Sequence, residues 1–67
     1  MDVDALCTSV FNREDAIRQS REISKVWFYY GFAFGEIHLA EMNKMISPEL
    51  AEVLRCGIEM AHMERMV

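Results

Sequence analysis

The feature that most limits what this chain can fold into is the run VWFYYGFAFG at residues 26–35. It contains the only Trp, both Tyr and three of the four Phe of the chain. Burying aromatic side chains is strongly favourable, because each removes a large apolar area from water. The rest of this 67-residue chain, or a second chain, is therefore expected to cover the run.

The run alone does not distinguish a strand from a helix, because Trp, Tyr, Phe and Val favour strands and Gly favours neither state. The flanking residues indicate a helix, since polar residues recur there at helical spacing. This polar stripe consists of Arg18, Glu22, Lys25, Tyr29, Glu36 and Asn43. Two apolar stripes lie opposite, one of Ile23, Val26, Trp27, Tyr30, Phe34 and Ile37, and the other of Phe28, Phe32, Leu39, Met42 and Ile46. A helix that is apolar on so many sides must be enclosed by several neighbours.

The capping residues predict the boundaries of three helices. We expect a short N-terminal helix over about residues 3–11, a long helix over about 13–45 and a returning helix over about 48–66. Asn12 is a good N-cap for the long helix, and the alternative is that the first helix runs straight through it. The clearest boundary is Ser47-Pro48-Glu49, because Ser47 suits the N-cap and proline suits the first helical position.

Gly31 and Gly35 are the weakest points of the long helix. One interpretation is a break near Gly31, which would give shorter helices. The other is a close helix crossing, because two glycines spaced four apart share one face and let another backbone approach. We favour the unbroken helix, since the polar stripe keeps its register on both sides of Gly31.

These patterns predict an all-α fold for residues 1–67 as a single small domain. The architecture is a helical hairpin with a short N-terminal helix, and two chains are expected to pair as a dimeric helical bundle. The aromatic run would form the shared core of that homodimer. Its expected members are Trp27, Phe28, Tyr30, Gly31, Phe32, Phe34, Gly35, Ile37 and Leu39.

Composition excludes several classes of function. The formal net charge of −4 opposes nucleic-acid binding, and Arg13, Arg18 and Arg21 alternate with carboxylates rather than forming a basic patch. The aromatic run is too short to span a membrane. The residues after Met1 do not have the pattern of a signal peptide. Two cysteines are too few for a disulfide framework, so we expect a cytoplasmic protein with reduced thiols.

Residues that could carry chemistry are few. Glu59 and His62 form an E-x-x-H element that, with Glu41, can build a di-metal carboxylate site in a dimeric hairpin, but Glu59 is expected to point away from the core. His38 and Cys56 are expected to be an interface histidine and an inert thiol, because neither has a partner at catalytic spacing. We therefore expect no enzyme activity and no catalytic, cofactor-binding or metal-binding residues.

The remaining function is interaction through helices. Size and the lack of catalytic groups are shared with small phage- or plasmid-encoded inhibitors of host proteins, and we expect a homodimer that binds and modulates a protein partner. The alternatives are a helical-bundle nucleic-acid regulator and a di-metal hairpin dimer. Candidate partner-binding residues are Tyr29, Glu36, Met63 and Met66. On the outer side of the last helix, Cys56, Met63 and Met66 accompany Glu52 and Glu59, and Val53, Met60 and Val67 form a further apolar line.

Overall fold

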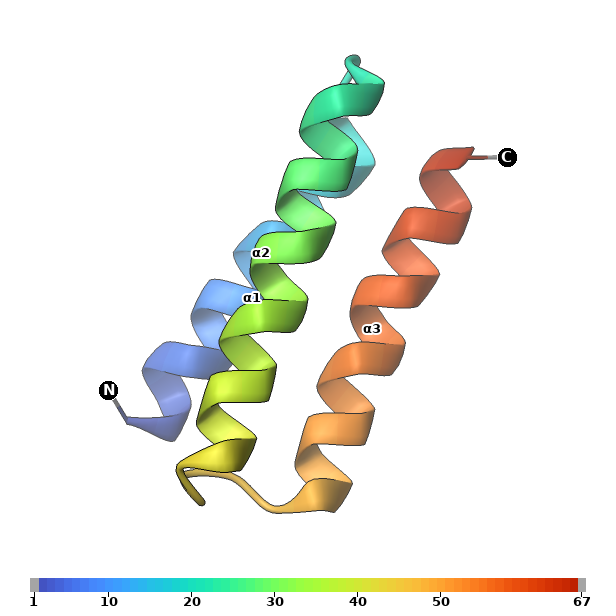
Figure 1. Cartoon of the computed structure of the whole chain (residues 1–67). Coiled ribbons are helices and arrows are strands. Elements are labelled where there is room, and N and C mark those ends of the chain that lie inside the picture. The colour runs from blue at the N-terminus through green and yellow to red at the C-terminus, as the bar shows by residue number, and fades with distance from the viewer. Residues whose placement is uncertain (1, 67) are drawn as a thin grey trace.

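The computed structural model describes residues 2–66, without the side chain of Met66, and this part of the chain contains helices and no strand (Figure 1). Helix α1 spans Val3–Gln19, α2 spans Ile23–Met42 and α3 spans Pro48–Met66. The all-α class predicted from the sequence is confirmed, and the last helix begins at Pro48 as expected.

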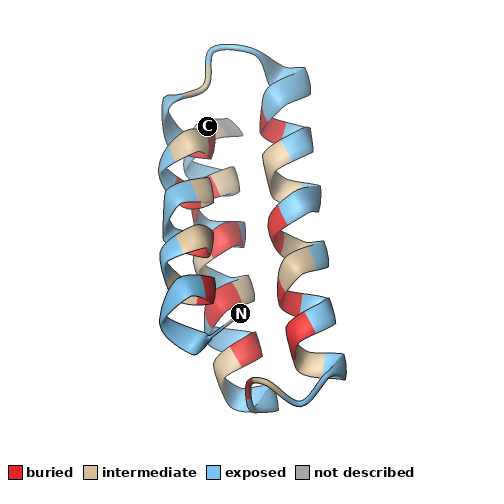
Figure 2. Ribbon diagram, turned by 90° about the vertical axis from the view of Figure 1, so that its left-hand side faces the viewer, coloured by how far each residue is buried: buried red, intermediate tan, exposed pale blue. Residues whose placement is uncertain are grey.

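The helices run up, down and up again, and each of them packs against both of the others (Figure 1). Buried residues lie on the faces that the helices turn toward one another, and exposed residues cover the outside (Figure 2). The core is aliphatic and draws on all three helices. Its buried members are Leu6, Val10, Ile17, Val26, Ala33, Ile37, Ala40, Ile46, Ala51, Leu54, Ile58 and Ala61.

The aromatic run is not the centre of this core, contrary to what its composition suggests. Trp27 and Phe28 are 52% and 63% exposed, and Phe32 is 46% exposed. The fully buried positions of α2 are small or aliphatic, whereas Tyr29, Tyr30 and Phe34 are only partly buried against the core. The single chain therefore buries the aliphatic face of α2 and leaves much of its aromatic surface in contact with solvent.

The predicted long helix over residues 13–45 is wrong, and so is Asn12 as its N-cap. Helix α1 runs straight through Asn12, and the chain reverses at residues 20–22. Both Ser20 and Glu22 have extended backbones, and the Ser20 hydroxyl donates to the Glu22 carbonyl and accepts from its N–H. A serine that bonds its local backbone competes with helical hydrogen bonds, which explains a break without Gly or Pro.

The link between α2 and α3 is short and well defined. Lys44 has a φ of 59°, a left-handed conformation common just after a helix. The Met45 N–H donates to the Ala40 carbonyl over 2.9 Å, so this turn satisfies a carbonyl at the end of α2. The Leu50 N–H donates to the Ser47 hydroxyl over 3.1 Å, which confirms Ser47 as the cap of α3.

Candidate functional site

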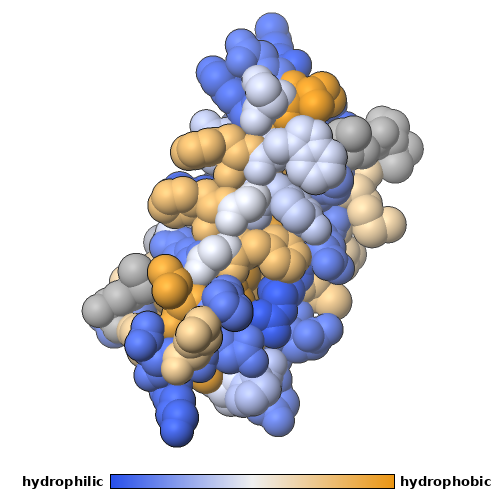
Figure 3. All heavy atoms as spheres, viewed as in Figure 1, coloured by the Kyte–Doolittle hydropathy of each residue, from blue (hydrophilic) through white to orange (hydrophobic). Residues whose placement is uncertain are grey.

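An exposed apolar surface runs along α2, and we call it the α2 outer face. It consists of Ile23, Trp27, Phe28, Gly31, Phe32, Gly35, Leu39 and Met42. Leu39 and Met42 are 61% and 65% exposed. Ser24, Lys25 and His38 are also exposed on this helix. In Figure 3, orange and near-white spheres form a band over α2, and blue spheres gather at both ends of the molecule.

Both glycines of the aromatic run open onto this face. A Cβ added at Gly31 or Gly35 would meet nothing within 4 Å outside the helix's own backbone and the neighbouring residues. Together with Phe32, Glu36 and Leu39 they line a shallow groove of about 330 Å³. No close crossing occurs inside the single chain, and the break proposed near Gly31 is absent because α2 continues to Met42. The glycines leave a depression in an otherwise bulky surface.

One edge of the α2 outer face is held by α1. The Arg13 guanidinium lies 4.4 Å from the centre of the Phe32 ring, a cation–π contact. The Ser9 hydroxyl lies 2.9 and 3.0 Å from the two carboxylate oxygens of Glu36. These contacts fix the orientation of α1 on α2. They also mean that Glu36, a predicted partner-binding residue, is already engaged within the chain.

The other edge of the face is held by α3 through an aromatic cluster. The His62 ring centre lies 4.7 Å from those of Trp27 and Tyr30, and Tyr30 lies 4.7 Å from Phe34. His62 Nε2 is buried and has no hydrogen-bond partner among the residues that the structure describes. The cluster closes the seam between α2 and α3, so Tyr30 and Phe34 are half-buried against the core.

The nine residues expected in the dimer core therefore separate into groups. Ile37 is fully buried inside one chain, so a second copy cannot reach it, and its assignment to an interface is corrected. Tyr30 and Phe34 contribute mainly to the α2–α3 seam. The remaining six residues lie on the α2 outer face, where they are accessible. They are Trp27, Phe28, Gly31, Phe32, Gly35 and Leu39.

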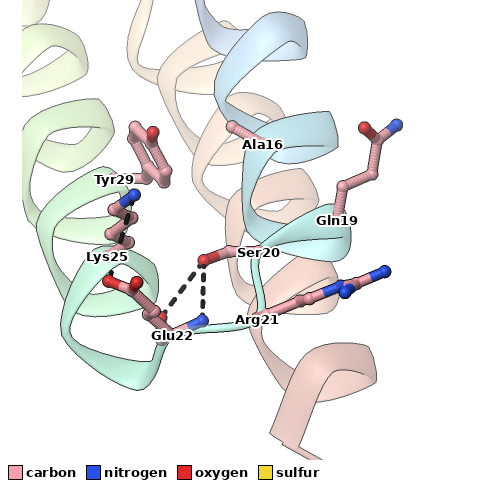
Figure 4. Close-up of a pocket in the computed structure, with 7 residues that line it drawn as sticks. All are labelled: Ala16, Gln19, Ser20, Arg21, Glu22, Lys25 and Tyr29. Atoms are coloured by element: carbon pink, nitrogen blue, oxygen red, sulfur yellow. Dashed lines mark hydrogen bonds and ion pairs between the residues drawn. The ribbon is translucent and has the colours of Figure 1, made fainter.

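Tyr29 is not on an open outer stripe. It is half-buried against the core and lines a polar hollow of about 310 Å³ where α1 turns into α2 (Figure 4). Its ring faces the side where Ala16 lies, and Lys25 stands nearby with its ammonium 3.9 Å from Glu22. The polar stripe that grouped Tyr29 with Arg18 crosses the break at residues 20–22, which is why its register misled the sequence interpretation.

A second apolar surface lies on α3. The sequence interpretation had placed Cys56 and Met63 on one side of the helix and Val53 and Met60 on a separate line. Val53, Met60 and Met63 are 65%, 58% and 64% exposed, and Cys56 is exposed between them. The spacing of residues 53, 56, 60 and 63 could have predicted one surface, since residues separated by alternating steps of three and four lie on the same face of a helix. The structure thus places Met63 on an accessible surface, whereas the side chain of Met66 lies outside the described part.

One carboxylate lies inside the bundle, and the sequence did not identify it. Glu14 is 8% exposed and packs over Gly57, where an added Cβ would lie 3.2 Å from the Glu14 carboxyl carbon. Burial raises the pKa of Glu14, partly offset by Arg18, while Asp15 and Glu64 raise it further. Because Gly57 has no side chain, it leaves room for this carboxylate.

The described residues offer no cluster of three or more His, Cys, Asp or Glu side chains that could bind a metal ion. Glu41 accepts hydrogen bonds from Arg55 at 3.0 Å, while His62 contacts the aromatic rings, so the E-x-x-H element does not meet Glu41. Within residues 2–66, no helix has the length and apolar character needed to cross a membrane.

Comparison with other proteins gives no functional assignment: no family model matches the chain, and neither curated proteins nor solved structures show significant similarity to it. The function must therefore be inferred from the surfaces themselves.

Proposed function

We propose that this chain is a non-enzymatic protein-interaction module that pairs with a second copy through the α2 outer face and modulates a protein partner through another surface. The observation that carries the proposal is the wide, uncharged apolar surface of α2. Soluble monomers seldom expose a continuous apolar patch of several hundred Å², and such patches usually mark contact sites.

The area of the face supports a second copy as its occupant. Its six large apolar residues are between 46% and 65% exposed. Because fully exposed side chains of this kind offer roughly 150–250 Å² each, together they present on the order of 700 Å² per chain. A standard interface takes about 800 Å² from each partner, so two such faces supply nearly all of it.

The order of residues along α2 suits a two-fold axis. In an antiparallel pair centred on Ala33, Gly31 of one copy lies beside Gly35 of the other. Phe28 then lies beside His38 of the second copy, and Ser24 beside Met42. The small residues let the backbones approach at the centre, and the larger ones surround them. The same surface is thus complementary to itself.

Charge supports the same arrangement. Two copies with a formal net charge of −4 repel each other at long range, so a homodimer is favoured by contact through a surface with few free carboxylates. The α2 outer face fits this description, because Glu36, which lines its groove, is hydrogen-bonded to Ser9, and Glu41 is bonded to Arg55. Lys25 lines the hollow near Ser20 on the α1 side.

Sedimentation velocity of the wild type and two charge variants tests this proposal. Leu39→Glu places a carboxylate on the α2 outer face, and Asn12→Glu adds the same charge to the exposed side of α1. We expect a dimer mass for the wild type and Asn12→Glu at micromolar concentration, and a monomer of unchanged helicity for Leu39→Glu. A wild-type monomer at 100 times that concentration, or a dimeric Leu39→Glu, contradicts the proposal.

A further inference from the structure

The second accessible apolar surface lies on α3, and we call it the α3 outer stripe. It consists of Val53, Cys56, Met60 and Met63. Neither the core nor the α2 outer face uses these side chains. From residue 53 to residue 63 the stripe extends about 15 Å, given a rise of about 1.5 Å per residue. That length matches about three turns of a helix laid alongside it.

Carboxylates border the α3 outer stripe. Glu52 and Glu59 are exposed and seven residues apart, so they share one edge, and Glu49 precedes Val53 by one turn. The cations of α3 point elsewhere. Arg55 donates to Glu41 on α2, and Arg65 donates to the Ser20 carbonyl. At the opposite edge Glu64 accepts from Arg18 at 2.7 Å.

We propose that the α3 outer stripe binds a basic amphipathic helix of a partner protein. Methionine side chains are flexible and polarizable, so they adapt to apolar residues of varied shape. The carboxylates at the edge attract Lys or Arg that flank such residues on the partner. This inference specifies the partner of the proposed interaction module and uses a different helix from the one proposed for pairing.

A second copy does not suit this stripe. In a parallel two-fold pair across α3, the edge of Glu52 and Glu59 meets the edge of Glu64, and in an antiparallel pair each edge meets the same edge of the other copy. Glu52 and Glu59 would then face an edge with carboxylates in either arrangement, and like charges placed opposite each other are unfavourable. The α2 outer face lacks this obstacle, so the two apolar surfaces differ in the occupant that each admits.

Two synthetic peptides provide the probe. The first is a helical peptide of about 14 residues with leucines at heptad spacing flanked by lysines, and the second replaces every lysine with glutamate. Binding to the full chain is measured by fluorescence anisotropy at low and physiological salt. We expect micromolar binding of the basic peptide, at least tenfold weaker binding of the acidic one, and a loss of affinity as salt rises.

Two double variants with the same change in charge locate the site. Glu52→Gln with Glu59→Gln should weaken binding of the basic peptide at least tenfold and flatten its salt dependence. Asp4→Asn with Asp15→Asn removes the same charge from the outer side of α1 and should leave the affinity within a factor of two. Equal effects of the two double variants would mean non-specific attraction and would overturn the inference.

A third double variant tests the apolar contact and separates the two proposals. Met60→Ser with Met63→Ser should weaken peptide binding at least tenfold while the sedimentation mass stays that of the wild type. A fall in mass would show that the α3 outer stripe joins two copies, which overturns the inference. Leu39→Glu should bind the peptide as the wild type does, so failure of the pairing proposal would leave this result intact.

Discussion

The inner faces of helices α1 and α2 are similar in composition, whereas their outer faces differ in polarity. Most outward positions of α1 are polar: Asp4, Thr8, Asn12, Asp15 and Gln19 are exposed, and Phe11, which is 56% exposed, is an apolar exception. The outward positions of α2 are mainly aromatic, aliphatic, methionine or glycine, although Ser24, Lys25 and His38 are exposed as well. Helix α1 is thus a simple amphipathic helix with one side to bury, whereas α2 remains apolar after the bundle has formed.

The difference between the two outer faces distinguishes the residues that folding requires from those that association would require. The aliphatic core joins all three helices, and its buried members do not include Trp27, Phe28 or Phe32. Selection for folding alone would favour polar residues on both outer faces, because exposed aromatic side chains promote aggregation. We propose contact with another molecule as the reason for the apolar α2 outer face. Each experiment below tests this separation.

The largest expected effect compares inner and outer positions on one helix. Ile37 is fully buried and Leu39 is 61% exposed. Ile37→Ala should lower the free energy of unfolding by about 2–5 kcal/mol, because it leaves a cavity in the core. Leu39→Ala should change it by less than about 0.5 kcal/mol when the chain is dilute enough to be monomeric. Urea denaturation of both variants measures the contrast, and equal losses would mean that the outer face is part of the fold.

The next effect concerns the glycines of the α2 outer face. In a monomer, alanine at Gly31 or Gly35 meets no other part of the chain, so each substitution should stabilise α2 by up to about 1 kcal/mol. In the antiparallel pair the added methyl groups should separate the backbones and weaken association at least tenfold. Thermal melts over a range of concentrations resolve the two effects. Stabilisation that is the same at every concentration would refute the crossing at the glycines.

How much of the fold can be predicted from the sequence depends on whether a boundary is set by local chemistry or by tertiary packing. Ser47 and Pro48 end one helix and begin another by local chemistry, so that boundary was predictable from the residues alone. The break at Ser20 was not predictable from the residues alone, because a serine interrupts a helix only when tertiary packing stabilises the reversal of the chain. Without that break, the polar stripe seemed continuous and α1 was shortened to residues 3–11.

The candidate site shows the same division. Exposure of Met63 followed from helical spacing, whereas Ile37 and Tyr29 were misplaced because their surroundings depend on how α1 folds back. The burial of Glu14 beside Gly57 was also beyond sequence reasoning, since it brings together residues from α1 and α3. Periodicity identifies the faces of a helix, but packing decides which of them the chain itself covers.

A smaller effect compares the starts of α1 and α2. The Ala5 N–H donates to the Asp2 carboxylate over 2.6 Å, whereas Glu22 makes no side-chain capping bond to α2. Asp2→Ala should therefore lower the free energy of unfolding by about 1 kcal/mol. Glu22→Ala is the matched control and should lower it by no more than about half as much. If chemical denaturation gives equal losses, the cap at Asp2 does not stabilise α1.

The smallest effect concerns Glu14, a charged residue of α1 that is only 8% exposed. Burial raises the pKa of Glu14, so the folded chain binds its proton more tightly than the unfolded chain does. This contribution to the free energy of unfolding is complete below the unfolded pKa and is lost as pH rises through the folded pKa. Glu14→Gln stays neutral, so near pH 7 it should be more stable than the wild type by about 1 kcal/mol or less, and the gain should vanish near pH 4. Exposed Glu52→Gln controls for net charge, and denaturation midpoints of Glu14→Gln that track those of Glu52→Gln at both pH values would mean that Glu14 is solvated.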